Sequence, residues 1–250
     1  ISDTPTTIVS NLKDDGYTCI AMHPYYETGW SRNLVYPHIG FDEMHFIDYF
    51  DQTKILREYI TDQELYDKII KRYENRKNNE KLFFMGITMQ NHGGYTETYD
   101  NFPENYYKVG RSYTDANQYL SLVHESDEAV KNLISYFSKV DDPVEIIFFG
   151  DHQPSLNSNF YPILNGKGLT GLTEDELEKL YTVPFFIWTN YDTPEETVDI
   201  TSLDYLSTMA LERAGIELPA YNKFLADMQE VVPAINSRGY YSKSKGCYLH

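Results

Sequence analysis

The sequence predicts an α/β fold in which a mainly parallel sheet is flanked by helices. Short apolar runs alternate with segments of helical periodicity along the 250-residue chain, and this alternation is typical of parallel strands covered by helices. Hydrophobic residues make up 41% and charged residues 24% of the chain, which excludes disordered and fibrous classes. The length fits a single domain over residues 1–250, in which residues 216–250 form a small C-terminal subregion.

The N-terminal elements are predicted from the residues at their boundaries. A helix is expected over residues 4–15, because Thr4 can cap it, Pro5 suits its first position and Gly16 stops it. An apolar strand follows over residues 17–22. Because the chain opens into a helix with no strand ahead of it, we expect the sheet to be incomplete at its N-terminal end.

The middle of the chain repeats the alternation of helix and strand. A helix over residues 61–73 begins with a capping box formed by Thr61 and Glu64. A charged link then leads to a second apolar strand over residues 82–89. The longest helix is expected over residues 114–140, where apolar residues recur at helical spacing.

The C-terminal half supplies two more apolar runs, over residues 144–149 and 183–188. A short helix capped at Thr173 lies between them. A last helix is expected over residues 202–214, and Gly215 ends it. Four apolar strands interleaved with helices complete the basis for the predicted sheet.

Charge and cysteine content exclude several classes of function. Lys and Arg number 21 against 38 Asp and Glu, a formal net charge of -17, which opposes binding to nucleic acid or to an anionic membrane. Cys19 and Cys247 are the two cysteines, so neither a disulfide framework nor a CxxC zinc motif is present. The sequence contains no apolar run of membrane-spanning length and no signal peptide. We therefore expect no nucleic-acid partner and no membrane contact from this chain itself.

Three of the apolar runs end at a histidine. The sequences are Cys19-Ile-Ala-Met-His23, Ile87-Thr-Met-Gln-Asn-His92 and Phe148-Phe-Gly-Asp151-His152. In open α/β sheets the ligand cleft lies beyond the carboxyl ends of the strands. Parallel neighbours would deliver these histidines and Asp151 to one edge, so we expect them to share a site.

The Asp151-His152 pair suits a metal ion. A carboxylate supplies a hard oxygen and an imidazole a borderline nitrogen, and Gly150 permits the sharp turn that lets both side chains converge. Ligand type alone accepts Mn, Mg or Zn. Two ligands do not complete a site, so we expect the others to come from elsewhere.

Trp30 and Arg32 lie on the segment that follows His23. Two residues apart in an extended loop, they would point the same way. The guanidinium can grip a phosphate or sulfate through two hydrogen bonds, while the indole offers a flat face and an N–H to a polyol. A structural role for both, with Trp30 anchoring the loop and Arg32 paired with an acid, fits the spacing equally well.

Five motifs follow one another in a fixed order along residues 8–215. They are His23-x6-Trp30-x-Arg32, Val35-Tyr-x-His38-x-Gly40-Phe-Asp42, Ile87-Thr-Met-Gln-Asn91-His92, Gly150-Asp151-His152 and the late helical segment from Ser202 to Gly215. This ordered set resembles the lipoteichoic acid synthase family, phosphoglycerol transferases of the sulfatase branch of the alkaline phosphatase superfamily.

The resemblance implies a role for each candidate residue. Asp151 and His152 would ligate a divalent metal, usually manganese, and the set that would line a glycerophosphate pocket is His23, Trp30, Arg32 and His92. His92 or His23 would hydrogen-bond the transferring group or protonate a leaving oxygen. The family's nucleophilic threonine, a further acidic ligand and its membrane helices all precede the matched region. We therefore expect this chain to be the C-terminal part of a catalytic domain, without the nucleophile and inactive in isolation.

The function implied is a phosphoglycerol transferase that acts on a lipid-linked phosphodiester. Its partners would be an anionic phospholipid head group and a polyol-phosphate acceptor, at the extracellular face of a bacterial cell membrane to which the parent protein is anchored. One alternative is a sulfatase or another ester hydrolase of the same superfamily, although neither cysteine lies in the C/S-x-P-x-R context of a sulfatase. The other alternative is a non-catalytic module that binds an anion or a polymer.

Overall fold

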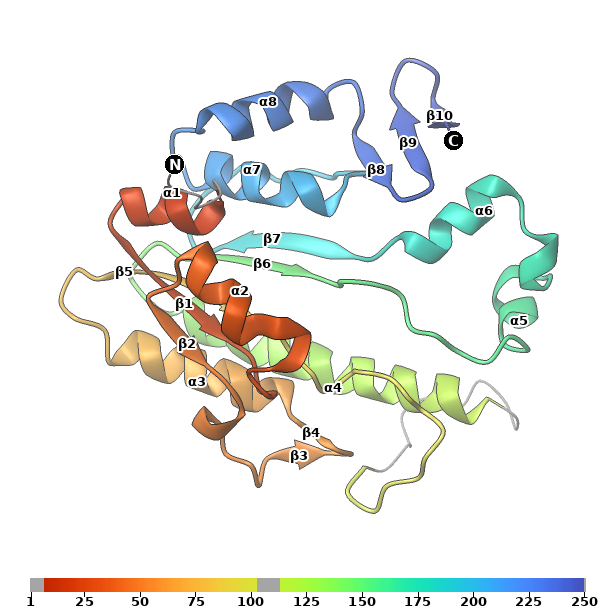
Figure 1. Ribbon diagram of the computed structural model, residues 1–250, viewed down its shortest axis with the longest axis horizontal. Coiled ribbons are helices and arrows are strands. Elements are labelled where there is room, and N and C mark those ends of the chain that lie inside the picture. The colour runs from red at the N-terminus through yellow and green to blue at the C-terminus, as the bar shows by residue number, and fades with distance from the viewer. Residues whose placement is uncertain (1–6, 103–112, 250) are drawn as a thin grey trace. The chain divides into compact units, whose positions relative to one another are not determined.

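A computed structural model describes residues 7–102 and 113–249 of the chain. These residues form two compact units. The first lies within Ile1–Lys139 together with Pro154–Gly166, and the second lies within Val140–Gln153 together with Lys167–His250. Both units combine strands with helices (Figure 1), and the predicted α/β class is confirmed.

The first unit is built on a three-stranded parallel sheet. Its order is β2-β1-β5, with β1 at Tyr17–Met22, β2 at Glu43–His45 and β5 at Lys81–Gly86. The apolar strand predicted over residues 17–22 is thus the central one, and its last four residues are buried. The second predicted strand ends at Gly86, three residues early, although the backbone N–H of Ile87 still donates to the carbonyl of Met22 at 2.9 Å.

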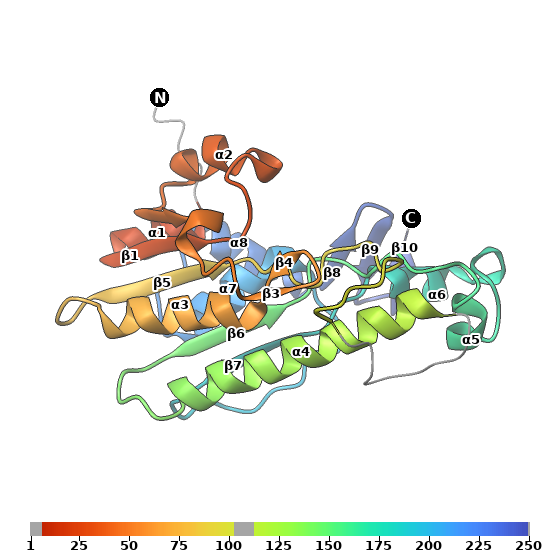
Figure 2. The ribbon, with the colours of Figure 1, turned by 90° about the horizontal axis from the view of Figure 1, so that it is seen from below.

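Helices cover this sheet. Helix α3 packs against β5 and α4 packs against α3, so the two helices lie side by side (Figure 2). The first unit also contains a small hairpin of β3 (Ile55–Leu56) and β4 (Tyr59–Ile60). Its helices are α1 (Ile8–Asp14), α2 (Arg32–Ile39), α3 (Asp62–Glu74), α4 (Thr114–Phe137) and α5 (Tyr161–Asn165).

The helix starts differ in part from the expected caps. Helix α1 is capped by Thr7, whose side chain accepts a hydrogen bond from the backbone N–H of Ser10, while the predicted cap at residues 4–5 lies outside the described residues. Thr61 caps α3 as expected. The capping box there is only half formed, because the Glu64 carboxylate turns away and accepts the backbone N–H of Asp51 at 2.8 Å.

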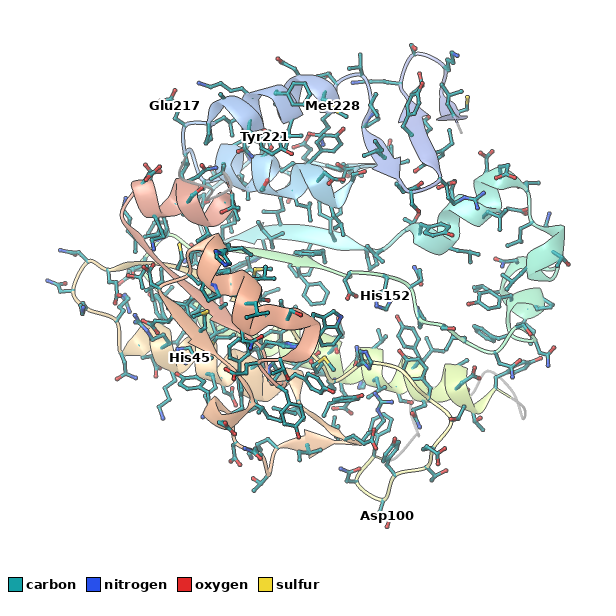
Figure 3. All side chains as sticks on the ribbon, viewed as in Figure 1. His45, Asp100, His152, Glu217, Tyr221 and Met228 are labelled. Carbon is teal, nitrogen blue, oxygen red and sulfur yellow. The ribbon has the colours of Figure 1, made fainter. Side chains whose placement is uncertain are left out.

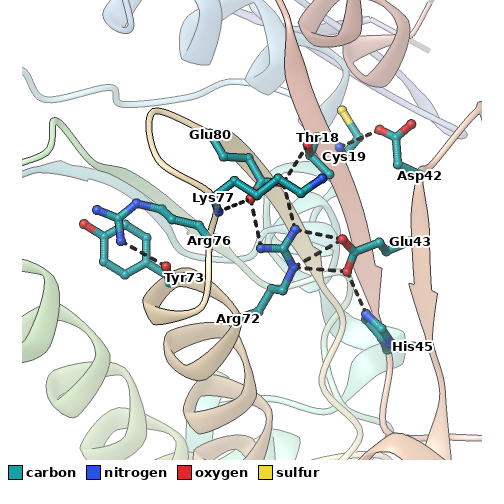
Figure 4. Close-up of polar contacts among 10 residues, drawn as sticks. All are labelled: Thr18, Cys19, Asp42, Glu43, His45, Arg72, Tyr73, Arg76, Lys77 and Glu80. Carbon is teal, nitrogen blue, oxygen red and sulfur yellow. Dashed lines mark hydrogen bonds and ion pairs between the residues drawn. The ribbon is translucent and has the colours of Figure 1, made fainter.

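One arginine ties α3 to the sheet (Figure 4). Arg72 forms ion pairs of 2.8 Å with Glu43 on β2 and 2.9 Å with Glu80, which precedes β5. The Glu80 carboxylate also accepts the hydroxyl of Thr18 on β1 at 3.0 Å. The hydrogen bonds from Arg72 lower the pKa of Glu80 to about 2. A single guanidinium therefore links α3 to β2 and to the residue before β5, and through Glu80 it is connected to β1.

The second unit contains the other two predicted apolar strands. Strand β6 (Glu145–Phe149) pairs with β7 (Phe185–Thr189) in antiparallel orientation, so this pair is an exception to the mainly parallel arrangement that was predicted. The segment between the two strands contains only short helices, whereas parallel neighbours are usually joined through a longer one. A second sheet is antiparallel, in the order β10-β9-β8. Its strands are β8 (Ala234–Asn236), β9 (Gly239–Ser242) and β10 (Cys247–Leu249).

Two helices of the second unit, α6 (Glu174–Glu178) and α7 (Leu203–Arg213), were predicted from the sequence, and a third, α8 (Ala220–Gln229), was not. The short helix α6 begins with the expected cap at Thr173. Helix α7 lies beside α8, as Figure 1 shows. Gly215 has a left-handed backbone with φ of 69°, which explains why the chain turns there. No helix in the described part of either unit has the length and apolar character needed to cross a membrane.

Candidate functional site

The parallel pairing of β1 with β5 places two predicted histidines at one edge of the sheet. His23 directly follows β1, and its backbone N–H donates to the carbonyl of His45 at 2.9 Å. His92 lies in the turn after β5, where its N–H donates to the carbonyl of Met89 at 2.9 Å. Both strands run in the same direction, so their carboxyl ends deliver His23 and His92 to the same side.

His23 is a buried, neutral hydrogen-bond acceptor. Its side chain is enclosed, with 1% of the residue surface exposed, and Nδ1 lies 2.9 Å from the carbonyl oxygen of Ile87. A carbonyl at that distance requires an N–H, so the proton sits on Nδ1 and Nε2 carries a lone pair. Among the described residues Nε2 has no hydrogen-bond partner. Burial lowers the pKa of His23 to about 4, which keeps the ring uncharged at neutral pH.

Trp30 lies between the other candidates. Its ring centroid is 5.9 Å from that of His23 and 6.1 Å from that of His92, and the guanidinium carbon of Arg32 lies 4.4 Å from the indole centroid. Such an Arg–Trp contact is a cation–π interaction. Four of the candidates predicted from sequence therefore lie together in the first unit.

The backbone that presents Trp30 is not the expected extended loop. Trp30 lies in a short 3-10 turn, Gly29–Ser31, with φ of 52°, and Ser31 has φ of 57°. Left-handed backbone is unfavourable for a bulky side chain, and such residues cluster at functional sites. Arg32 instead begins α2 and reaches Trp30 by folding back over the indole, held by a 2.9 Å hydrogen bond from Nε to the Tyr36 hydroxyl. No carboxylate of the described residues pairs with Arg32, and its Nη2 group is free among them.

Two tyrosines that sequence reasoning missed complete the cluster. The Tyr25 ring lies 5.8 Å from Trp30 and 6.3 Å from Tyr59. The Tyr59 ring lies 5.7 Å from His92, and its hydroxyl lies 3.3 Å from His92 Nδ1. Tyr25 follows the strand-end histidine by two residues, which is a usable signal, whereas Tyr59 lies in the β3–β4 hairpin and no motif marks it. We call His23, Tyr25, Trp30, Tyr59 and His92 the aromatic cluster.

Asp151 and His152 belong to the second unit, directly after β6 and Gly150 (Figure 3 labels His152). Their side chains are 84% and 75% exposed. His152 Nδ1 lies 2.9 Å from the carbonyl oxygen of Gln153, so Nδ1 carries the proton and Nε2 is free. Nε2 lies 3.6 Å from Asp151 Oδ2. A lone pair beside a carboxylate oxygen suits a metal cation between them.

This pair fits a divalent metal as two of its ligands. The carbonyl of Gln153 fixes the tautomer that leaves Nε2 able to bind a cation, as outer partners of metal-binding histidines usually do. In residues 7–102 and 113–249, however, no three His, Cys, Asp or Glu side chains come together around one point. A complete ligand set therefore needs further donors. That Asp151 and His152 share a pocket with His23 and His92 stays a prediction.

Comparison with known proteins places these features in a family context. The sequence model of the family described as Sulfatase matches residues 1–216. A protein of Rhizobium meliloti, provisionally named for cyclic beta-1,2-glucan modification, is 26% identical over 232 residues, which is 90% of this chain and 36% of the relative. The lipoteichoic acid synthase of Staphylococcus saprophyticus is 30% identical over 146 residues, which is 56% of this chain and 22% of the synthase. The chain thus spans between 22% and 36% of the length of these relatives.

A solved structure shows the same fold. The Streptococcus pyogenes phosphoglycerol transferase GacH, solved in complex with sn-glycerol-1-phosphate, superposes with a TM-score of 0.70 at 22% sequence identity. The superposition covers 89% of this chain and 56% of that chain. It confirms the fold that the ordered motifs indicate.

Proposed function

The chain belongs to the sulfatase family, and on that premise we propose that it forms part of a phosphoglycerol transferase. The substrate would be a lipid-linked phosphodiester, such as the head group of an anionic phospholipid. A hydroxyl nucleophile located outside this chain would attack phosphorus, form a glycerophosphoryl-enzyme and release the lipid alcohol. A hydroxyl of the polyol-phosphate acceptor would then take the glycerophosphoryl group from the enzyme. We place this reaction at the extracellular face of the bacterial cell membrane, where the parent protein would be anchored.

The observation that carries the proposal is that an unpaired cation, Arg32, lies against the Trp30 ring of the aromatic cluster, which also contains the neutral acceptor His23. The chain has a net charge of -17, yet Arg32 presents a guanidinium with no carboxylate partner among the described residues. A planar guanidinium binds phosphate oxygens through two parallel hydrogen bonds. The edge of the sheet therefore offers a local attraction for an anion on a protein that otherwise repels anions.

His23 and His92 would recognise different parts of the substrate. Neutral His23 carries a lone pair on Nε2, which accepts a hydrogen bond from a hydroxyl and repels a phosphate oxygen. Because this atom is buried, a hydroxyl has to enter the interior of the first unit to reach it. We therefore assign it to a glycerol hydroxyl. His92 is exposed and presents Nε2 while Nδ1 faces the carbonyl of Gly93 at 3.0 Å. In its protonated form it would donate to the transferring phosphoryl group or protonate a leaving oxygen.

Asp151 and His152 would hold a divalent cation, with Mn as our first choice and Mg or Zn as acceptable on ligand type. Such an ion supplies Lewis-acid stabilisation of charge on the phosphoryl oxygens. The support for this assignment is the tautomer of His152 and the 3.6 Å approach of its Nε2 to Asp151 Oδ2.

The test uses the full-length protein and two matched aspartate variants. Asp151→Ala should abolish transfer of the head group from fluorescent phosphatidylglycerol, because the cation loses its charged ligand. Asp227→Ala removes an exposed aspartate of α8 in the same unit and should leave the rate unchanged. Turnover of Asp151→Ala near the parental rate would rule out the metal assignment. Turnover of an aryl sulfate in place of the phosphodiester would assign the protein to the sulfate-ester hydrolases instead.

A further inference from the structure

We propose that Arg57 is a positioning residue for His92, and that its buried guanidinium fixes the turn from which His92 reaches the substrate. The inference rests on the proposed function for the role of His92, but the contacts that carry it belong to Arg57 alone. Arg57 lies far from every motif that marks the candidate site in the sequence. It occupies the two-residue turn between β3 and β4.

The backbone at Arg57 is unusual for its residue type. Its φ is 54°, in the left-handed region where hairpin turns normally carry Gly, Asn or Asp. An arginine is disfavoured there, because its Cβ crowds the backbone. Its presence indicates that the side chain contributes something that a good turn residue cannot.

The side chain of Arg57 turns inward, and only 5% of the residue is exposed. Four of its five donor hydrogens have acceptors. Nη2 donates to the carbonyls of Gln90 and His92, both at 2.8 Å, and Nη1 donates to the carbonyl of Gly94 at 2.9 Å and to Oε1 of Gln118 at 3.1 Å. Three of the four acceptors are alternate carbonyls of the one turn that carries His92.

No carboxylate of the described residues forms an ion pair with this buried charge. Instead, three tyrosine rings surround it, with centroids 5.4 Å (Tyr95), 5.8 Å (Tyr59) and 6.0 Å (Tyr99) from the guanidinium carbon. A buried cation without a charged partner is expensive unless its donors are satisfied. The turn carbonyls therefore stabilise the charge, and the charge in return fixes the turn.

The same hairpin also supports the imidazole itself. Tyr59, two residues after Arg57, contacts the His92 ring at 5.7 Å and places its hydroxyl 3.3 Å from Nδ1. The hairpin is itself held in place, because Asn101 Nδ2 donates to the carbonyl of Arg57 at 3.1 Å. Backbone and ring of His92 are thus both held by the β3–β4 hairpin, while its side chain stays exposed for a ligand.

An arginine is required here because of its shape. Its planar fork directs each terminal nitrogen at two acceptors, so that carbonyls spaced along the turn are bound at once. A lysine keeps the charge but carries all its donors on one nitrogen. Arg57→Lys is therefore the informative variant, and Arg57→Gly is the second, because glycine suits the left-handed turn and removes the clamp without straining the hairpin.

The first measurement is amide hydrogen exchange in the full-length protein. The His92 amide donates to Met89, so its exchange rate reports opening of the turn. We expect exchange of residues 90–95 to accelerate by about ten-fold or more in both Arg57 variants, while α3 is unchanged. Arg76→Lys, two residues after the end of α3 in the same unit, is the control and should leave residues 90–95 at the parental rate. Unchanged exchange at the turn, or equal acceleration in α3, would overturn the proposal.

The second measurement separates this inference from the proposed function. We expect Arg57→Lys to weaken binding of sn-glycerol-1-phosphate about five-fold or more, and to have less than about a two-fold effect when His92 is already alanine. Equal weakening in both backgrounds would show that Arg57 does not act through His92 and would overturn the proposal. If the parental protein binds no glycerol phosphate, the proposed function fails, and the exchange experiment still decides the positioning role.

Discussion

Two buried ionisable groups of the first unit should give opposite pH dependence to its stability. Asp62 is 2% exposed and accepts the Ser126 hydroxyl on Oδ2 at 2.5 Å. Burial raises the pKa of Asp62 from 3.8 to about 6. Burial lowers the pKa of His23 from 6.5 to about 4. Both groups are therefore more stable uncharged in the folded protein.

The signs of the two contributions are opposed. Folded Asp62 holds a proton that the unfolded chain has released, so its stabilisation is full below pH 3.8 and is lost as the pH rises through 6. Folded His23 is neutral where the unfolded chain is protonated, so its stabilisation is full above pH 6.5 and is lost as the pH falls through 4. At 1.36 kcal/mol per pKa unit, each shift is worth about 3 kcal/mol.

Between pH 4 and 6 the contributions of Asp62 and His23 to the free energy of unfolding should change with pH in opposite directions and nearly cancel in the parental protein. A variant that removes one of the two groups should therefore show the pH dependence caused by the other. Relative to the parent, Asp62→Asn should gain stability as the pH rises, by about 1.4 kcal/mol per pH unit. His23→Gln should lose stability at about the same rate as the pH rises. Subtracting the parental curve removes the contribution of all other titrating groups.

The assay is urea unfolding followed by tryptophan fluorescence between pH 4 and 6. Trp30 lies in the first unit and Trp188 in the second, so a Trp188→Phe background makes the signal report the first unit alone. Asp67→Asn, an exposed position on α3, is the control and should follow the parental curve. If the difference between Asp62→Asn and its parent is flat over this range, burial does not govern the ionisation of Asp62.

Three further outcomes are expected. Arg72→Met should lower the free energy of unfolding by about 2 kcal/mol, because two partly buried glutamates lose their cation. This loss, measured by urea unfolding, should become smaller as the pH falls below 4.5. An unchanged urea midpoint at pH 7 would refute the prediction. Gly150→Ala should cost about 1 kcal/mol, since a Cβ there would lie 3.1 Å from the Cβ of Val183; a thermal melt at or above the parental one would contradict the close approach. Asp151→Asn should abolish the broadening of the neighbouring imidazole NMR signals by Mn²⁺, and equal broadening in the variant would exclude Asp151 as a ligand.

Features determined by neighbouring residues could be predicted from the sequence. The strand at residues 17–22 and the cap at Thr173 depend on short apolar runs and on hydrogen bonds across three residues, and both are confirmed. The direction of β7 could not be predicted, because it depends on which strand the chain meets after a long connection. The hydrophobic periodicity of a segment and the β-propensity of its residues do not indicate which strand it pairs with.

Some residues of the candidate site could likewise be predicted from the sequence and others could not. Strand ends identified His23 and His92, since the parallel pairing of β1 and β5 follows from the fold class. The contact between Trp30 and Arg32 arises instead from left-handed backbone, which residue types alone do not predict. Arg57 was missed because its acceptors lie more than thirty residues away in the chain, and a lone arginine in a turn resembles any surface cation.

The hairpin that carries Arg57 has a consequence for protein engineering. Because the carbonyls of the His92 turn are held by a side chain from another part of the chain, that turn is not a portable module. A graft of residues 88–95 into a related scaffold should reproduce the native loop only when residues 55–60 are transplanted with it. Libraries that diversify the loop while keeping both segments in register should retain far more ordered members than libraries that vary either one alone.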